Sequence, residues 1–561
     1  MGATQSSIQP HILQTERGKL RGLEFTAAQT GEPVYRRYTR VPYAQPPVGD
    51  LRWRRPQPLP ERWSFNDTSG APGDYTQFGP VCPQPTSSHT LALVDNKSAA
   101  PPISNVEDED CLYLNIWVPA GKPPEGGWPV QFQIHGGWLQ VGNASQTHDH
   151  DPFDLFVHSR PRIVVAPTYR LNVFGFLAGR DLSAAIPEAM SGNFGLWDQR
   201  AALEWTHANI SLFSGDPDNI AVGGLSAGSY SALLQLHHDT YLPADRRIIK
   251  RVYLWSNAIA IQPHSTNSTF LTEQFASLCR VHDISLGLSA PEKVALLRRI
   301  PAAELIASFS RLKYHTFRAS TDDAFVSSTF LSSLHSGRFT SKLAEHDVSI
   351  VLGDVLDEHA LYALSKPVTD FSDLVVQLEN YYPHAVARAL VRAHGVSEET
   401  HRSDSAAWTE AFGRMVADGQ VHASVRGLTH LLLHPPAPHS GLPASNVHRY
   451  RIEYRWKDSG RWIRPGLSVC HASDIPIWWA SGFRAGFSPE ERAAALQFLE
   501  PFDRFLYGEE DVRWGGAGGE DRVRLLDRRG HVVEGSTDRD WARGLAVWEA
   551  IWNAQKEQVA S

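Results

Sequence analysis

The chain has 561 residues, of which 42% are hydrophobic and 20% charged, a composition typical of a protein that buries a large core. Its 53 basic and 61 acidic side chains give a formal net charge of −8, which argues against a basic surface for nucleic acid or for an anionic membrane. No run approaches the roughly 20 apolar residues of a membrane-spanning helix. We therefore expect small-molecule partners, and composition leaves the oligomeric state open.

The N-terminal stretch, MGATQSSIQPHILQTERGKL, shows no charged start followed by an apolar run. No signal peptide is therefore predicted, and we expect a cytoplasmic protein, with secretion as the alternative. Gly2 and Ser6 have the spacing of an N-myristoylation signal, but small polar residues are common at N-termini. The sequence does not decide whether Gly2 is lipidated.

Short apolar, β-branched runs alternate with helical periods along the chain. The runs predict buried strands at Pro129–Ile134, Ile163–Pro167, Asn219–Gly224, Val252–Ser256 and Ser349–Val355. Helices are predicted over 196–214, 227–238, 359–365 and 489–506. This alternation indicates an α/β fold with a mainly parallel sheet covered on both faces, in one domain over 1–561.

Other stretches are less readable. Residues after 507 are acidic and polar, and we expect a peripheral tail that ends in an amphipathic helix near 539–556. Loops around 60–105, 262–345 and 365–445 should shape the approach to a site, but their patterns do not predict a fold. No internal repeat or long low-complexity segment is present.

One pentapeptide carries the strongest chemical signal. The predicted strand over 219–224 runs into Gly224-Leu-Ser226-Ala-Gly228, and a helix-prone stretch follows. This is the context of a nucleophile elbow, in which a serine occupies a strained strand-to-helix turn and flanking glycines allow close backbone approach. We interpret Ser226 as a nucleophile, and the alternative is a structural serine at a glycine-rich turn.

A serine nucleophile also needs hydrogen-bond donors for the oxyanion that develops on the substrate. The N–H of Ala227, at the start of the predicted helix, is one candidate. The strand over 129–134 leads directly into His135-Gly-Gly137-Trp138, which is similar to the glycine-rich oxyanion loop of such enzymes.

At this point the chain resembles the type-B carboxylesterase/lipase family, the relatives of cholinesterases, along nearly its whole length. The matching segments stand in the family's order: VPYAQPPVGDLRW at 41–53, EDCLYLN at 109–115, YRLNVFGFL at 169–177, GNFGLWDQ at 192–199 and ALEW at 202–205. The resemblance implies an α/β-hydrolase fold with large insertions and a serine esterase without cofactor. It also assigns the oxyanion donors to Gly137, Trp138 and Ala227.

The family also carries a Glu acid and a His base. Glu358, in the segment GDVLDEH at 353–359, matches the acid, although His359 stands where the family has Gly. Asp354 and Asp357 remain alternative acids, since spacing does not rank the three. His471, in VCHASDIPIWW at 469–479, matches the base and follows the expected order of serine, acid, histidine.

Trp138 departs from the family, which has Gly at the third position of this run. Its N–H can donate only if the backbone angles suit a residue with a Cβ. We hypothesise that its indole narrows the acyl pocket and favours planar or short acyl groups.

Cysteine usage gives a mixed signal. The resemblance pairs Cys82 with Cys111 in a disulfide, whereas Cys279 lacks a partner and Cys470, beside the base, is expected to be a buried thiol. The disulfide would suit an oxidising compartment, whereas the N-terminus indicates the cytosol. Whether the pair is oxidised stays open.

Two histidine groupings look like metal ligands. They are His148-Asp-His150-Asp151 and the pair His430 and His434, and neither has the Glu of a HExxH site. A polar loop and a helix end are the better interpretations, so no metal is predicted. No nucleotide-binding motif is present.

We therefore expect hydrolysis of carboxylic esters through an acyl-enzyme on Ser226, with His471 as base and Glu358 orienting it. An acyltransferase or lactone-forming enzyme on the same residues is one alternative. A catalytically inactive binding protein, a class this family also contains, is the other. The natural ester cannot be derived from the sequence.

Overall fold

A computed structural model describes residues 7–85, 106–144, 151–186, 192–365, 367–400, 404–457, 466–515 and 519–560. One 13-stranded sheet runs through them in the order β1-β2-β3-β5-β7-β6-β8-β9-β10-β11-β12-β13, with β4 beside β2. The first seven strands are β1 (Ser7–Thr15), β2 (Gly18–Thr26), β3 (Pro33–Pro42), β4 (Gly73–Asp74), β5 (Tyr113–Pro119), β6 (Trp128–Ile134) and β7 (Ile163–Pro167). The others are β8 (Gly215–Leu225), β9 (Arg251–Trp255), β10 (Ser349–Val355), β11 (Val447–Ile452), β12 (Arg522–Leu526) and β13 (Val532–Thr537).

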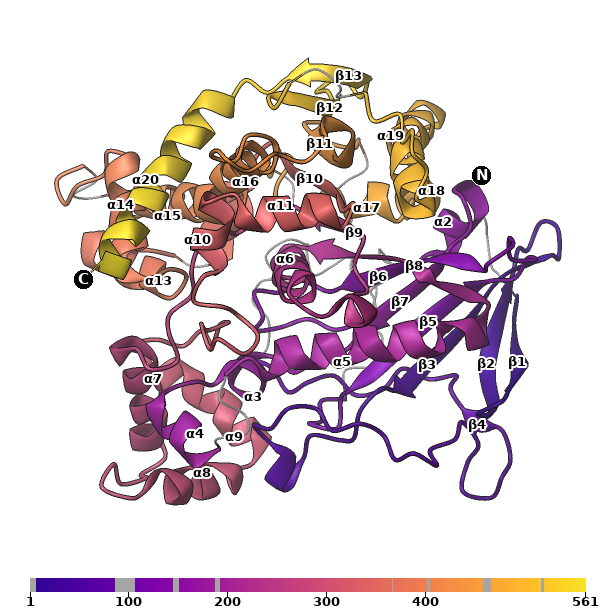
Figure 1. Ribbon diagram of the computed structural model, residues 1–561, viewed down its shortest axis with the longest axis horizontal. Coiled ribbons are helices and arrows are strands. Elements are labelled where there is room, and N and C mark those ends of the chain that lie inside the picture. Colours follow the sequence, from indigo (N-terminus) through magenta and orange to yellow (C-terminus); the bar gives the residue numbers. More distant parts are fainter. Residues whose placement is uncertain are drawn as a thin grey trace.

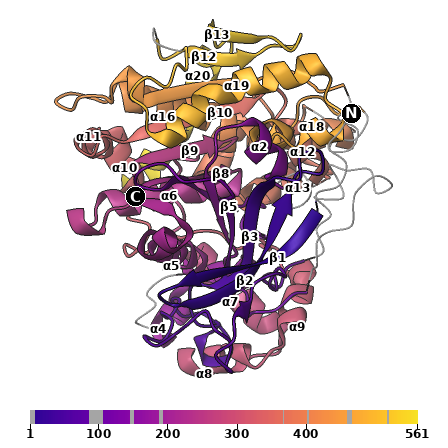
Figure 2. The same cartoon turned by 90° about the vertical axis from the view of Figure 1, so that its right-hand side faces the viewer.

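The centre of the sheet is parallel and its N-terminal part is antiparallel. Strands β7, β6, β8, β9, β10, β11 and β12 pair in parallel, whereas β1, β2, β3 and β5 pair in antiparallel fashion. The five predicted strands are confirmed as β6 to β10, and β8 begins four residues earlier than predicted. Figures 1 and 2 show β12 and β13 at one end of the sheet and β1 and β2 at the other.

Helices cover both faces of this central sheet. Helices α5 (Phe194–Asn209) and α6 (Ala227–Thr240) cover one face, and α19 (Pro489–Tyr507) covers the other (Figure 1). Alternate residues of β10 divide between two apolar cores: Ile350 and Leu352 join the core beneath α6, and Val351 joins the core beneath α19. A strand buried on both faces has no polar side, which explains the continuous apolar runs.

The stretches that the sequence left unassigned are largely helical. Residues 262–345 form α7 (Thr269–Val281), α8 (Ala290–Arg298), α9 (Ala302–Ala307), α10 (Phe330–His335) and α11 (Arg338–Glu345). Residues 367–433 form α13 (Phe371–Glu379), α14 (His384–Ala393), α15 (Ser405–Ala417) and α16 (Ala423–Leu433), with a π-helical turn over Asp418–His422. The short helices are α2 (Phe153–His158), α3 (Asn172–Phe176), α4 (Arg180–Ala185), α12 (His359–Ser365), α17 (Ile475–Trp478) and α18 (Gly482–Ala485).

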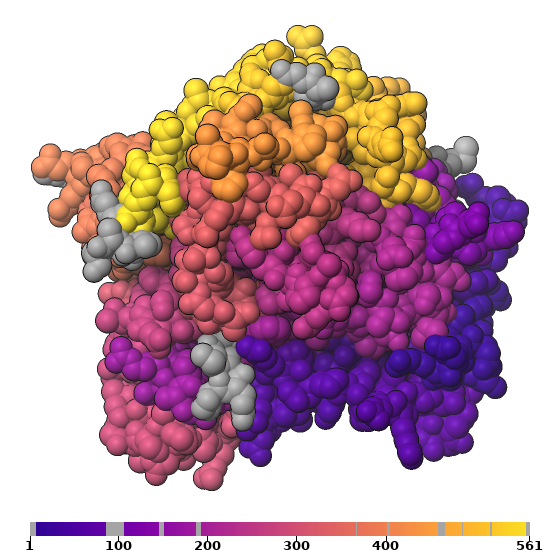
Figure 3. All heavy atoms as spheres, viewed as in Figure 1, coloured from indigo at the N-terminus to yellow at the C-terminus, as the bar shows by residue number. Residues whose placement is uncertain are grey.

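The expectation of a peripheral tail after residue 507 is wrong. Strand β12 extends the sheet beside β11, and α20 (Trp541–Ala560) packs against α16 with Trp548 and Ile551 almost fully buried. Figure 3 shows this C-terminal part, in yellow, as a broad continuous portion of the molecule. Composition misled because several apolar residues of the tail, among them Val547, Trp548 and Ile551, are buried. In addition, the buried Arg426 and Arg449 compensate one of its acids, Asp538.

The remaining expectations can be placed in part. Cys82 and Cys111 are buried thiols and are not joined in a disulfide. His430 and His434 both contact Glu520, at 2.7 and 3.6 Å, and the described residues hold no group of three or more potential ligands that could bind a metal ion. Gly2, Ser6, His148 and His150 lie outside the described residues. Within the described part of the chain, no helix is both long and apolar enough to cross a bilayer.

Candidate active site

Ser226 follows the last residue of β8 and immediately precedes α6. Its backbone has φ 60° and ψ −126°, a conformation that residues with a side chain rarely adopt. Two hydrogen bonds hold it there: its N–H donates to the Trp255 carbonyl at 2.9 Å, and its own carbonyl accepts from the Tyr230 N–H at 3.0 Å. The strained strand-to-helix turn expected of a nucleophile elbow is therefore present.

Close packing explains the two glycines around Ser226. A Cβ on Gly224 would lie 2.2 Å from the Ile134 carbonyl oxygen, and one on Gly228 would lie 2.0 Å from the same oxygen. The end of β6 thus passes against the turn at a distance that only glycine permits. The GxSxG spacing is in this way a requirement of the contact between β6 and β8.

The loop after β6 lies against the serine. A Cβ built on Gly136 would be 3.1 Å from Cβ of Ser226. Gly137 has φ 110°, and a Cβ there would lie 2.0 Å from the Val141 carbonyl oxygen, so this position excludes every other residue type. Trp138 has φ 58°, in the left-handed region, and thus occupies a strained conformation that residues with a Cβ adopt rarely.

The amides of this region suit an anion site. Among the described residues, the N–H groups of Gly137 and Ala227 donate to no other backbone group. The loop itself is braced by His135, whose ring stacks on Tyr169 at 4.3 Å and whose carbonyl accepts from the Tyr169 hydroxyl at 2.8 Å. Burial lowers the pKa of His135 to about 4, so the ring is neutral at pH 7 and adds no charge to the loop.

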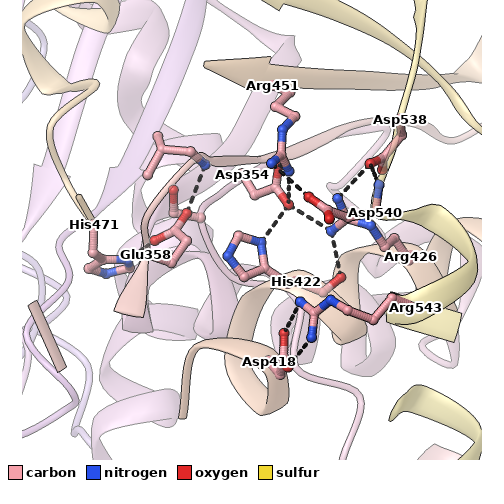
Figure 4. A network of polar contacts seen from close by, with 12 residues as sticks. Asp354, Glu358, Asp418, His422, Arg426, Arg451, His471, Asp538, Asp540 and Arg543 are labelled. Carbon is pink, nitrogen blue, oxygen red and sulfur yellow. Dashed lines mark hydrogen bonds and ion pairs between the residues drawn. The ribbon is translucent and has the colours of Figure 1, made fainter. Parts of the chain in front are cut away.

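A short parallel bridge brings Glu358 and His471 together. Asp357, just after β10, pairs with Cys470, and its N–H donates to the Val469 carbonyl at 2.9 Å. Glu358 and His471, the residues that follow Asp357 and Cys470, are therefore neighbours across the bridge. His471 Nδ1–H donates to Glu358 Oε2 at 2.5 Å, and Glu358 Oε1 accepts from the Val355 N–H at 2.9 Å (Figure 4).

Both partners of this pair are shielded from solvent. Glu358 is 0% and His471 2% exposed, and His471 Nε2 has no hydrogen-bond partner. That nitrogen is the one a general base would use, and catalytic hydrogen bonds are often open in the absence of substrate. Trp255, whose carbonyl holds the Ser226 amide, stacks at 4.6 Å on Trp478, seven residues after His471.

The structure separates the three candidate acids by their partners. Asp354 accepts hydrogen bonds from Arg426 at 2.7 Å, from His422 at 2.8 Å and from Arg451 at 3.2 Å. Although burial alone would raise it, these neighbours hold the pKa of Asp354 well below its usual range. Asp357 contributes its backbone to the bridge, and Glu358 alone of the three bonds to His471 (Figure 4).

The sequence analysis missed Tyr362 and the environment of Asp474. The Tyr362 ring lies 5.1 Å from the His471 ring and 6.2 Å from that of Trp138, so it connects the base with the oxyanion loop. Its position on α12, four residues after Glu358 at the start of that helix, was the available signal. Asp474 accepts from Trp478 Nε1 at 2.8 Å, and burial, with the charge of Glu358, raises its pKa to about 6.

Comparison with known proteins identifies the family: residues 9–515 match the model of the carboxylesterase family, and the chain belongs to that family. It is a carboxylic ester hydrolase of the esterase/lipase type. The α/β-hydrolase fold implied by the sequence resemblance is consistent with the mainly parallel, helix-flanked sheet.

Three relatives illustrate the match. A protein of Schizosaccharomyces pombe described as an uncharacterized esterase/lipase is 40% identical over 539 residues, 95% of each chain. A carboxylic ester hydrolase of Gibberella moniliformis is 37% identical over 541 residues, 95% of this chain and 94% of that one. The para-nitrobenzyl esterase of Bacillus subtilis is 34% identical over 304 residues, about half of each chain.

Proposed function

We propose that the chain hydrolyses carboxylic esters through a covalent acyl-enzyme on Ser226, with His471 as general base and Glu358 as the acid that orients it. The observation that carries the proposal is the buried Glu358–His471 hydrogen bond of 2.5 Å with Nε2 left unbonded. An imidazole held by a carboxylate on one nitrogen and open on the other is the arrangement that activates a serine hydroxyl.

In the first half-reaction, the Ser226 Oγ bonds to the ester carbonyl carbon while His471 Nε2 takes the hydroxyl proton. Negative charge then develops on the carbonyl oxygen, where the N–H groups of Gly137, Trp138 and Ala227 donate to it. The carbon–oxygen bond to the alcohol breaks, and the alkoxide leaves with the proton from Nε2. Glu358 fixes the Nδ1–H tautomer and stabilises the transient imidazolium.

In the second half-reaction, water replaces the alcohol. His471 Nε2 takes a proton from water as its oxygen bonds to the acyl carbon, and the same oxyanion donors act again. The bond to Ser226 Oγ then breaks, Oγ regains the proton, and the carboxylic acid leaves. No group outside the chain, apart from substrate and water, enters either step.

Labelling with a fluorophosphonate tests the nucleophile. We expect covalent modification of Ser226 in the folded chain, and Ser226→Ala should remove both labelling and hydrolysis of a para-nitrobenzyl ester. Ser229→Ala is a matched control, because that buried hydroxyl donates to the Asn257 carbonyl instead of facing the loop after β6. Labelling at another residue, or activity retained in Ser226→Ala, would contradict the proposal.

The two alternatives give different results. An acyltransferase would divert the acyl group to an added alcohol or amine at concentrations where water still exceeds the acceptor, so product analysis with and without acceptor separates transfer from hydrolysis. An inactive binding protein would neither label nor turn over. The unbonded Nε2 of His471 and the strained Ser226 support the active enzyme.

A further inference from the structure

A cavity next to the proposed nucleophile has a cation in its wall. Its volume is about 50 Å³, and Tyr230, Arg318 and Tyr381 are among its lining residues. Tyr230 lies on α6, four residues after Ser226, which places this wall about 6 Å further along the helix axis. On another side, the indole of Trp138 is directed at the hydroxyl of Tyr381. The cavity therefore lies one helical turn from the serine, and Tyr381 in its wall lies beside the oxyanion loop.

The segment that carries Arg318 is fixed to the oxyanion loop. The Phe317 N–H donates to Gln140 Oε1 at 3.1 Å, and Gln140 Nε2 donates to the Phe317 carbonyl at 2.5 Å. Two residues after Arg318, the Ser320 N–H donates to Asn193 Oδ1 at 2.9 Å. The segment is thus held on both sides of Arg318, on one side by the region of the oxyanion loop.

The guanidinium of Arg318 is also oriented. Its Nε donates to the Asn380 carbonyl at 2.8 Å, and its Cζ lies 4.3 Å from the centre of the Tyr381 ring. Burial raises the pKa of Tyr230 and of Tyr381, and the positive charge of Arg318 acts against that rise at both residues. The positive charge of Arg318 therefore acts on two tyrosines in the cavity wall.

This cation lacks a countercharge. Nη2 of Arg318 is buried without a hydrogen-bond partner, and no ion pair joins Arg318 to a carboxylate in the described part of the chain. The acid that lines the same cavity, Glu379, is engaged elsewhere: its two oxygens contact His384 at 2.5 Å and the Tyr314 hydroxyl at 3.2 Å. A half-buried, uncompensated guanidinium is costly unless an anion joins it.

We propose that Arg318 binds a carboxylate of the substrate, so that the preferred esters carry a second, ionised carboxyl group on their acyl or alcohol part. The inference rests on the proposed function, because it places this anion beside the acyl-enzyme site on Ser226. Guanidinium and carboxylate match as a planar, charge-assisted pair, and the Tyr381 face behind Arg318 keeps the fork from turning away.

Matched substrates test this proposal. One arm uses 4-nitrobenzyl monoesters of succinate, glutarate and adipate against the same esters with a terminal carboxamide. The other arm uses acetyl esters of 4-(hydroxymethyl)benzoate and of its carboxamide. We expect the acid to exceed its carboxamide in kcat/KM by about tenfold or more in one arm, which identifies the half of the ester that reaches Arg318.

Variants separate charge recognition from folding, because the ratio of acid to carboxamide cancels a general loss of active protein. Arg318→Gln should bring the ratio close to one, and Arg318→Lys should keep part of it, since lysine retains the charge without the fork. Glu379→Gln, in the same cavity, should keep or increase the ratio, and the exposed Arg513→Gln should leave it as in the wild type.

Several outcomes would overturn the proposal: a wild-type ratio near one in both arms, a ratio unchanged in Arg318→Gln, or a preference for the neutral ester. If the carboxamide esters are hydrolysed and Ser226 is labelled, such a result refutes only this inference. Calorimetric binding of the intact acid and carboxamide esters to Ser226→Ala gives the same comparison without turnover. Equal affinities there would refute carboxylate recognition even if the proposed function also failed.

Discussion

Two carboxylate–imidazole pairs project from the end of β10. Asp354 accepts from Nδ1–H of His422 at 2.8 Å, and Glu358, four residues later, accepts from Nδ1–H of His471 at 2.5 Å. Both carboxylates are almost completely buried. The pairs differ in what else touches the carboxylate: Asp354 also binds two guanidiniums, whereas Glu358 binds only a backbone N–H (Figure 4).

Because their additional partners differ, Asp354 and Glu358 have different roles. The Asp354 cluster continues through Arg426 to Asp538, just ahead of α20, so it joins the sheet to the C-terminal helix. A carboxylate that is also bound by two guanidiniums responds little to the state of one imidazole. Glu358 faces one imidazole alone and can stabilise its charge as it forms. A carboxylate–histidine pair is thus not by itself a sign of catalysis.

The sharpest contrast between the pairs should come from Glu358→Gln. We expect kcat for a neutral ester to fall by about 10³-fold or more, because the amide neither fixes the His471 tautomer nor stabilises the imidazolium. The free energy of unfolding should change much less. Steady-state kinetics beside thermal unfolding of the same preparation measures both, and near-normal kcat would remove Glu358 from the mechanism.

Asp354→Asn should give the opposite pattern. Loss of the buried charge leaves Arg426 and Arg451 without their shared anion, which should lower the free energy of unfolding by about 3–5 kcal/mol. The half-exposed Arg543→Gln, which removes one partner of Asp418, should cost less than about 1 kcal/mol. Denaturant titration measures both losses. A stable Asp354→Asn variant that has lost activity would place this cluster in the chemistry instead.

A third acid allows a pH test. The pKa of Asp474 is raised by burial from 3.8 to about 6, so the folded state holds this proton more tightly than the unfolded state. Stability from this group is complete below about pH 4 and is lost as the pH rises toward 6. Asp474→Asn, which can still accept from Trp478, should remove that loss.

Unfolding at about pH 4 and about pH 8 measures this effect. Relative to the wild type, Asp474→Asn should gain on the order of 2 kcal/mol at the higher pH compared with the lower one. A pH dependence that is the same in both proteins would show that Asp474 does not hold a proton in the folded state at pH 5. In that case the charges of Asp474 and Glu358 would have to coexist behind His471.

The smallest effect concerns the oxyanion loop. We propose that the Trp138 indole limits the acyl pocket, a view supported by its burial and its contact with Tyr362 at 6.2 Å between rings. Trp138→Gly should raise the ratio of octanoyl to acetyl ester hydrolysis by about tenfold. Glycine suits the left-handed backbone there, so the loop should persist. An unchanged preference among acetyl, benzoyl and octanoyl esters would contradict this role.

Much of the central architecture followed from local patterns. The predicted strands from β6 to β10 and the helix after Ser226 are present because buried parallel strands need continuous apolar runs, whose lengths the sequence displays directly. The glycines around Ser226 predicted the turn for a reason that is also local, because only glycine fits against the end of β6.

The insertions and the tail could not be predicted in this way. The helices of the insertions pack against other helices, and β12 joins the sheet by pairing with β11. In this pairing Tyr450 lies 74 residues before its partner Arg524. Such long-range pairing leaves no local periodicity. The polar tail was judged by its composition, whereas apolar side chains such as Trp548 and Ile551 are buried in the core.

By itself, the sequence determined the strand–turn–helix context of Ser226, the position of the glycine loop and the family resemblance. It assigned the acid to Glu358 only through that resemblance, with Asp354 and Asp357 as alternatives that spacing could not rank, and it gave no reason to single out Arg318. Only the tertiary structure distinguished them, because charge partners and burial depend on segments far apart in the chain. Two arginines and a histidine surround Asp354, one imidazole meets Glu358, and Arg318 stands in a cavity wall without an anion.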